Sequence, residues 1–139
     1  MKVQTYTGVM FDILEPRKQD IRIEDIGRGL SNQARFNGQS ALPITIAQHS
    51  LELADKVDLS KKGLGRPGSY MEYYRENNIL ELIFDKYGIN WPLSNELIKA
   101  DKDLTEFELN YRTKEADPYR IMTCDKAYAE WMGAVKEII

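Results

Sequence analysis

Two side chains of metal-binding types stand out because both occur on predicted helices with apolar faces. His49, in the segment Ile-Ala-Gln-His-Ser, is the only histidine among 139 residues, and Asp101 lies in Ile-Lys-Ala-Asp-Lys-Asp. Asp101 falls on an apolar helical face, where a carboxylate needs a partner because desolvating its charge is costly. No His-Asp dipeptide lies between the two residues. The sequence therefore contains half of a metal site.

Arg35 is a candidate for anion binding. The periodicity predicts that it ends a helix, where a cation is favourable for the helix dipole, and a glycine-containing loop follows. A guanidinium also matches the geometry of phosphate, so a phosphate clamp is the functional alternative. The neighbouring Phe36 either stacks on a base or packs against the loop, and we favour packing.

Other catalytic motifs are missing from the sequence. It has no phosphate-binding glycine loop, no nucleophile elbow and no Cys-x-x-Cys pair. The single cysteine, Cys124, is interpreted as a buried or helix N-terminal residue rather than a nucleophile.

The elements that must position these side chains are mainly helical. Two short strands, 3–6 and 9–13, flank a turn at residues 6–8 and predict an N-terminal hairpin. Apolar periodicity and capping signals predict five helices in one domain spanning residues 1–139. They cover 20–35, a segment with Pro43 in its first turn, 70–87, 94–111 and a last helix capped by Thr123. Gly27 and Gly29 in the first helix indicate close packing or a kink.

Composition narrows the classes of partner. The net charge is −3 and the calculated pI is about 5.3, which argues against a broad basic face for duplex nucleic acid. One cysteine suits a reducing compartment. No stretch approaches the roughly 20 apolar residues of a membrane span, and no signal segment follows Met1. We expect a complete cytoplasmic protein that binds neither duplex nucleic acid nor membrane.

Several short motifs occur in an order that is characteristic of one family. The chain resembles the short HD-domain phosphohydrolases common in bacteriophages, which are relatives of bacterial 5′-deoxynucleotidases and of phage deoxynucleoside triphosphohydrolases. The resemblance covers most of the chain and implies an HD-domain-like helical bundle, with Glu106 downstream of Asp101 fitting its later helix. The motifs are residues 5–8 (TYTG), 11–14 (FDIL), 23–26 (IEDI), 30–32 (LSN), 35–38 (RFNG) and 46–50 (IAQHS).

The resemblance assigns roles to three residues. In such enzymes a first His, a central His-Asp pair and a distant Asp hold a divalent metal, which polarises the phosphate and lowers the pKa of the attacking water. His49 corresponds to the first His, Asp101 to the distant Asp and Arg35 to a substrate-contacting Arg. The central segment with the His-Asp pair and a catalytic Glu is missing, and Gln39 stands where the family commonly has His.

These departures predict a pseudoenzyme that retains a nucleotide-shaped pocket. The leading hypothesis is a phage protein that binds a nucleotide or nucleotide-derived signal, sequestering it to counter host defence, with no cofactor beyond weakly bound divalent metal. One alternative is an active phosphohydrolase whose site is rebuilt by Glu52, Asp55 or Asp58. Another is an inhibitor that binds a host protein. Self-association is also expected, with Tyr70, Tyr73 and Tyr74 as interface candidates. The predicted ligand-binding residues are Arg35, Phe36, Gln39, His49, Lys99 and Asp101.

Overall fold

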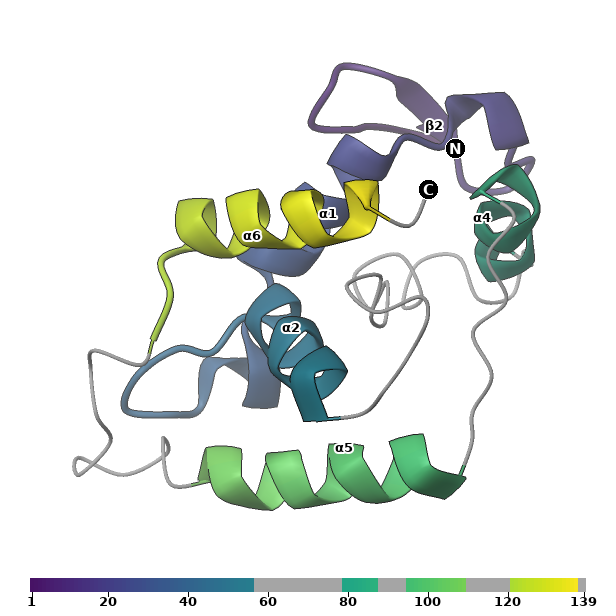
Figure 1. Cartoon of the computed structure of the whole chain (residues 1–139). Coiled ribbons are helices and arrows are strands. Elements are labelled where there is room, and N and C mark those ends of the chain that lie inside the picture. The colour runs from purple at the N-terminus through teal and green to yellow at the C-terminus, as the bar shows by residue number, and fades with distance from the viewer. Residues whose placement is uncertain (57–78, 88–94, 110–120, 138–139) are drawn as a thin grey trace.

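The computed structural model describes residues 1–56, 79–87, 95–109 and 121–137, and this part of the chain is mainly helical with a small N-terminal sheet (Figure 1). The predicted fold class is confirmed. Five α-helices occur in the described residues, and short 3₁₀ turns precede and follow the first one. The elements are β1 (Lys2–Gln4), β2 (Met10–Asp12), η1 (Lys18–Asp20), α1 (Ile23–Asn32), η2 (Arg35–Gly38), α2 (Ile46–Lys56), α4 (Ile79–Tyr87), α5 (Asn95–Glu108) and α6 (Cys124–Lys136).

The predicted hairpin is present, and α1 holds its turn in place. β1 and β2 are antiparallel, with Val3 opposite Phe11. Gly8 adopts φ +92° in the turn, a conformation that glycine reaches without steric cost. The buried carboxylate of Asp25 accepts hydrogen bonds from the backbone N–H of Thr7 at 2.8 Å and from its hydroxyl at 3.0 Å. The turn of the sheet is therefore anchored to the first turn of α1.

Arg28 gives the hairpin a second attachment, to α6. Its guanidinium carbon lies 4.8 Å from the centre of the Tyr6 ring and 4.0 Å from that of Tyr128, distances at which a cation is attracted to an aromatic face. One nitrogen also donates to Asp125 at 2.9 Å. Residues from the turn, α1 and α6 thus meet around one cation.

Close packing of α1 against α6 explains Gly27. A Cβ atom added at Gly27 would lie 2.9 Å from Cε3 of the fully buried Trp131 and 3.0 Å from the sulfur of Met132. The glycine therefore permits the close approach of the two helices. Close packing, rather than a kink or a merely tolerated glycine, is the interpretation that the contacts of Gly27 support.

We predict opposite effects for two Gly→Ala substitutions in helices. Gly27→Ala should lower the free energy of unfolding by about 1–3 kcal/mol, because the methyl group enters the space of the Trp131 ring. Gly133→Ala in α6 should raise it by about 0.5–1 kcal/mol, because among the described residues no atom beyond its chain neighbours and the backbone of α6 lies within 4 Å of the added Cβ, and alanine favours the helix. Urea denaturation of both variants provides the measurement. A stabilised Gly27→Ala protein would contradict the packing argument.

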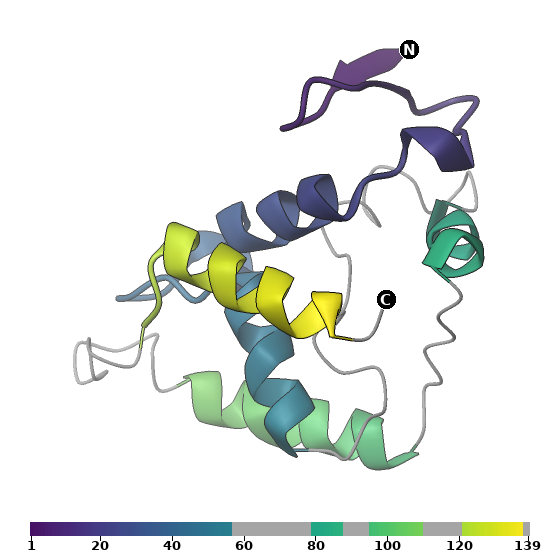
Figure 2. The same ribbon diagram turned by 45° about the horizontal axis from the view of Figure 1, so that its top comes forward.

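Helix α2 lies between two layers. In both views it runs between the α1–α6 pair and α5 (Figures 1 and 2). An amphipathic helix at a surface buries one stripe, whereas α2 is covered from two directions. The consequence is an unusual run of buried polar residues in its N-terminal half and at the residue before it, comprising Thr45, Gln48, His49 and Ser50.

The helix limits around Arg35 differ from those predicted. α1 ends at Asn32, and Gln33 and Ala34 are extended. Ala34 forms a bridge with Thr45, and the backbone N–H of Arg35 donates to the carbonyl of Ile44 at 2.7 Å. This pairing replaces the last predicted helical turn, so the prediction that Arg35 ends a helix is wrong. For the same reason Pro43 precedes α2 rather than occupying its first turn.

Later helix signals are partly confirmed. The Thr123 hydroxyl accepts a hydrogen bond from the backbone N–H of Lys126 and caps α6 as predicted. Cys124 is the first residue of α6 and is exposed. Three predicted features lie outside the described residues: residue 94 as the start of its helix, the first part of the helix predicted from residue 70, and the three candidate interface tyrosines. No helix in the described ranges combines the length and the apolar character needed to cross a bilayer.

Candidate functional site

His49 and Asp101 lie on facing helices and contact each other. His49 lies on α2 with 2% of its surface exposed, and its Nε2 is 2.7 Å from Oδ1 of Asp101 on α5. The predicted juxtaposition of these two residues is confirmed. Asp101 keeps 23% of its side-chain surface exposed, so the histidine is deep in the site and the aspartate is nearer its rim.

Glu108 occupies the other side of the histidine ring. Its Oε1 contacts Nδ1 of His49, and the Glu108 side chain has no exposed surface. Asp101 and Glu108 are seven residues apart, about two helical turns, and therefore share one face of α5. Both ring nitrogens of His49 therefore face a carboxylate from this face of α5.

Arg35 joins the same network through Glu108. Its Nε lies 2.6 Å from Oε2 of Glu108, and one terminal nitrogen donates to the hydroxyl of Thr105 at 3.0 Å. The contact with Glu108 is close enough for an ion pair but is not aligned as a hydrogen bond, and both atoms are buried. Glu108 thus bridges His49 and Arg35.

The loop after Arg35 has an unusual backbone. Phe36, Asn37 and Gly38 all have positive φ values, of 58°, 53° and 74°. Phenylalanine rarely adopts this left-handed conformation, and such strain clusters at functional sites. The half-buried Phe36 ring lies 5.2 Å from the guanidinium carbon of Arg35. The ring thus packs on Arg35, as expected if Phe36 packs against the loop rather than stacking on a base.

Two other predicted site residues are placed differently. Gln39 is exposed at the end of η2, where its backbone N–H donates to the carbonyl of Phe36. Lys99 is exposed on α5, and two residues before Asp101 it is about 200° away around the helix axis. Lys99 therefore lies on a different face of α5 from Asp101, and its cooperation with Arg35 stays a prediction.

The acidic residues proposed for a rebuilt metal site are dispersed. Asp55 is exposed, Glu52 accepts a hydrogen bond from Gln48 at 3.3 Å, and Asp58 lies outside the described residues. Within the described ranges, no three His, Cys, Asp or Glu side chains are arranged to hold a metal ion. Asp101 and Glu108 fail to form such a group because they lie at opposite nitrogens of the His49 ring.

Glu108 and Thr105 were missed by the sequence analysis. The resemblance pointed to Glu106 instead, but Glu106 is exposed. A side chain five residues after Asp101 points about 140° away from it around the helix axis. The available signal was the spacing of Asp101, Leu104 and Glu108. These positions, three and four residues apart, recur on one helical face.

Comparison with known proteins places the chain in no characterised group. No family model matches it. An uncharacterized protein of Rhodobacter capsulatus is 38% identical over 61 residues, a segment covering 42% of this chain and 31% of that protein. The chain thus corresponds to less than a third of this relative's length. The HD-domain resemblance stays a prediction.

Proposed function

We propose that this chain is a degenerate HD-domain-like protein that binds a nucleotide or nucleotide-derived signal without hydrolysing it. The observation that carries the proposal is the convergence of Arg35, His49 and Asp101 in one partly buried network. These are the residues to which the resemblance assigns substrate and metal contacts, and they come from η2, α2 and α5. In a phage-infected cell such a protein would sequester the signal and counter host defence.

The composition of the site favours binding over catalysis. His49 is the only histidine in the sequence, so no second histidine exists to complete the family's metal site. Both ring nitrogens of His49 face carboxylates, whereas a metal-binding histidine offers one nitrogen to the metal and donates through the other. A divalent ion at this position would have to displace Asp101 from Nε2 while retaining it as a ligand.

Arg35 supplies the cation for the phosphate. A guanidinium has five N–H donors, and the contacts with Glu108 and Thr105 involve two of its nitrogens. Its side chain is 18% exposed, which leaves an edge open to a ligand. Charge-assisted hydrogen bonds to phosphate are stronger than neutral ones. The overall charge of −3 makes such a local cationic site necessary for binding an anion.

Replacing Arg35 tests the binding proposal. Arg35→Ala should weaken nucleotide binding by about ten- to a hundred-fold, the effect of losing one charged hydrogen bond of about 1.5–3 kcal/mol. Arg17→Ala is the matched control, because Arg17 is 63% exposed and pairs only with the nearby Asp20 among its described ion pairs. Calorimetry would use deoxynucleoside mono- and triphosphates, cyclic nucleotides and ADP-ribose. Binding that ignores Arg35, or no binding at all, favours the protein-interaction alternative.

Hydrolysis should be absent or very weak. We expect no turnover of deoxynucleoside mono- or triphosphates or of cyclic nucleotides with Mn²⁺, Co²⁺ or Mg²⁺, because the sequence lacks the second histidine and the catalytic glutamate. Release of inorganic phosphate and chromatography of the products would detect it. Robust turnover that disappears in His49→Ala would show an active phosphohydrolase instead.

A further inference from the structure

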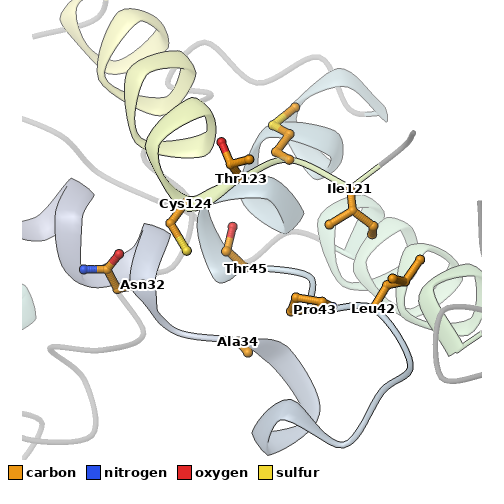
Figure 3. Close-up of a pocket in the computed structure, with 9 residues that line it drawn as sticks. Asn32, Ala34, Leu42, Pro43, Thr45, Ile121, Thr123 and Cys124 are labelled. Carbon is orange, nitrogen blue, oxygen red and sulfur yellow. The ribbon is translucent and has the colours of Figure 1, made fainter. Parts of the chain in front are cut away.

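A pocket opens beside the Arg35 network, where the N-termini of α2 and α6 approach the end of α1. Its volume is about 380 Å³. Leu42, Pro43 and Ile121 lie at one end of it, and Asn32 and Cys124 lie at the other (Figure 3). The pocket is therefore apolar at one end and carries a carboxamide and a thiol at the other.

The pocket adjoins the network on two segments. Thr45 lines the pocket and directly precedes α2, and its carbonyl accepts a hydrogen bond from the backbone N–H of His49 at 3.0 Å. Ala34 also lines the pocket, and the next residue is Arg35. A single ligand could therefore place one group in the pocket and another group at Arg35.

A buried hydrogen bond fixes one wall of the pocket. The side chain of Gln48, only 1% exposed, accepts a hydrogen bond from the backbone N–H of Met122 at 2.9 Å. Met122 belongs to the segment that leads into α6 and lines the pocket. The wall is thus held by a contact between residues 74 positions apart. A pocket held in this way is formed before a ligand arrives, as is usual for small-molecule sites.

We infer that this pocket holds the ring of the ligand: a planar, mostly apolar group with a polar edge, such as a nucleobase. The apolar end packs against the faces of the ring, and the Asn32 carboxamide offers a donor and an acceptor to its edge. Its volume falls at the lower end of the range for ligand pockets, which suits one ring system rather than a whole nucleotide. The inference rests on the proposed function for the identity of the ring.

Cys124 provides a direct test, because it is the only cysteine and lies exposed at the pocket. We would measure its alkylation by iodoacetamide, an uncharged reagent, with adenosine or thymidine as the probe and ribose as the control that lacks a nucleobase. Alkylation should slow about tenfold when the nucleoside is at about nine times its dissociation constant. Ribose should have no effect. Unchanged alkylation at the solubility limit of both nucleosides would overturn the inference.

Two variants of the pocket and one control variant test whether the protection of Cys124 depends on the pocket. Ala34→Leu fills the pocket and Leu42→Ala removes part of its apolar wall, so each should abolish or reduce the protection. Ala129→Leu, at an exposed position of α6, is the matched control and should keep it. Protection equal to wild type in both pocket variants would place the ring elsewhere and contradict the inference.

The outcome is distinguishable from that of the proposed function. Nucleotide binding that depends on Arg35, with no protection of Cys124 by nucleoside or nucleotide, would reject the pocket and retain the proposed function. Nucleoside protection with phosphate binding that ignores Arg35 would retain the pocket and reject the proposed role of Arg35.

Discussion

Glu108→Gln should destabilise the protein by about 3–5 kcal/mol, the cost of breaking a buried charge network by removing one partner. Glu108 has no exposed surface and contacts both His49 and Arg35. Glutamine retains nearly the same volume, so the loss reports charge and hydrogen bonding rather than a cavity. Urea denaturation followed by far-UV circular dichroism would measure it.

Glu106→Gln is the matched control for this prediction. Glu106 lies on the same helix but is exposed, and a substitution at such a position should change stability by no more than about 0.5 kcal/mol. Equal effects of the two substitutions would contradict the network.

A double-mutant cycle isolates the Arg35–Glu108 contact. The combined Arg35→Met and Glu108→Gln protein should be more stable than the sum of the single losses predicts, because neither partner is then left as an uncompensated charge. A coupling energy of about 0.5–3 kcal/mol is expected for groups in direct contact. Additive losses would show that the two side chains do not interact.

Trp131→Ala should lower the free energy of unfolding by a similar amount, about 3–5 kcal/mol. Trp131 is fully buried on α6, and its ring packs at the position of Gly27 on α1. Removing the indole leaves a cavity between the two helices that carry the hairpin. Far-UV circular dichroism is the suitable probe, because the substitution removes one of the two tryptophans.

Trp131→Phe distinguishes the loss of packing from the loss of the indole nitrogen. Nε1 of Trp131 is buried and has no hydrogen-bond partner among the described residues, so phenylalanine removes an unsatisfied polar group while retaining an aromatic ring. The cost should be under about 2 kcal/mol. Leu14→Ala is a surface control, since Leu14 is 65% exposed, and should have little effect. A loss for phenylalanine as large as for alanine would contradict a packing role.

Local patterns in the sequence were sufficient for several features. Alternation and a glycine turn predict the hairpin, helical spacing predicts that His49 and Asp101 lie on apolar faces, and the hydroxyl of Thr123 predicts the start of α6. Each feature depends on residues within about one turn of each other, where hydrogen-bonding and steric rules act directly. The prediction that Gly27 marks close packing belongs with them, although its partner was unknown.

The tertiary structure alone decided how the site is assembled. Ala34 pairs with Thr45, which ends α1 early and turns Arg35 toward α5. Glu108 binds His49 across 59 positions of sequence, and no local rule distinguishes it from the exposed Glu106. The physical reason is the position of α2 between two layers: burial on both sides brings polar groups from distant segments into a desolvated space. There each charge is stable only beside a partner that the sequence cannot specify locally.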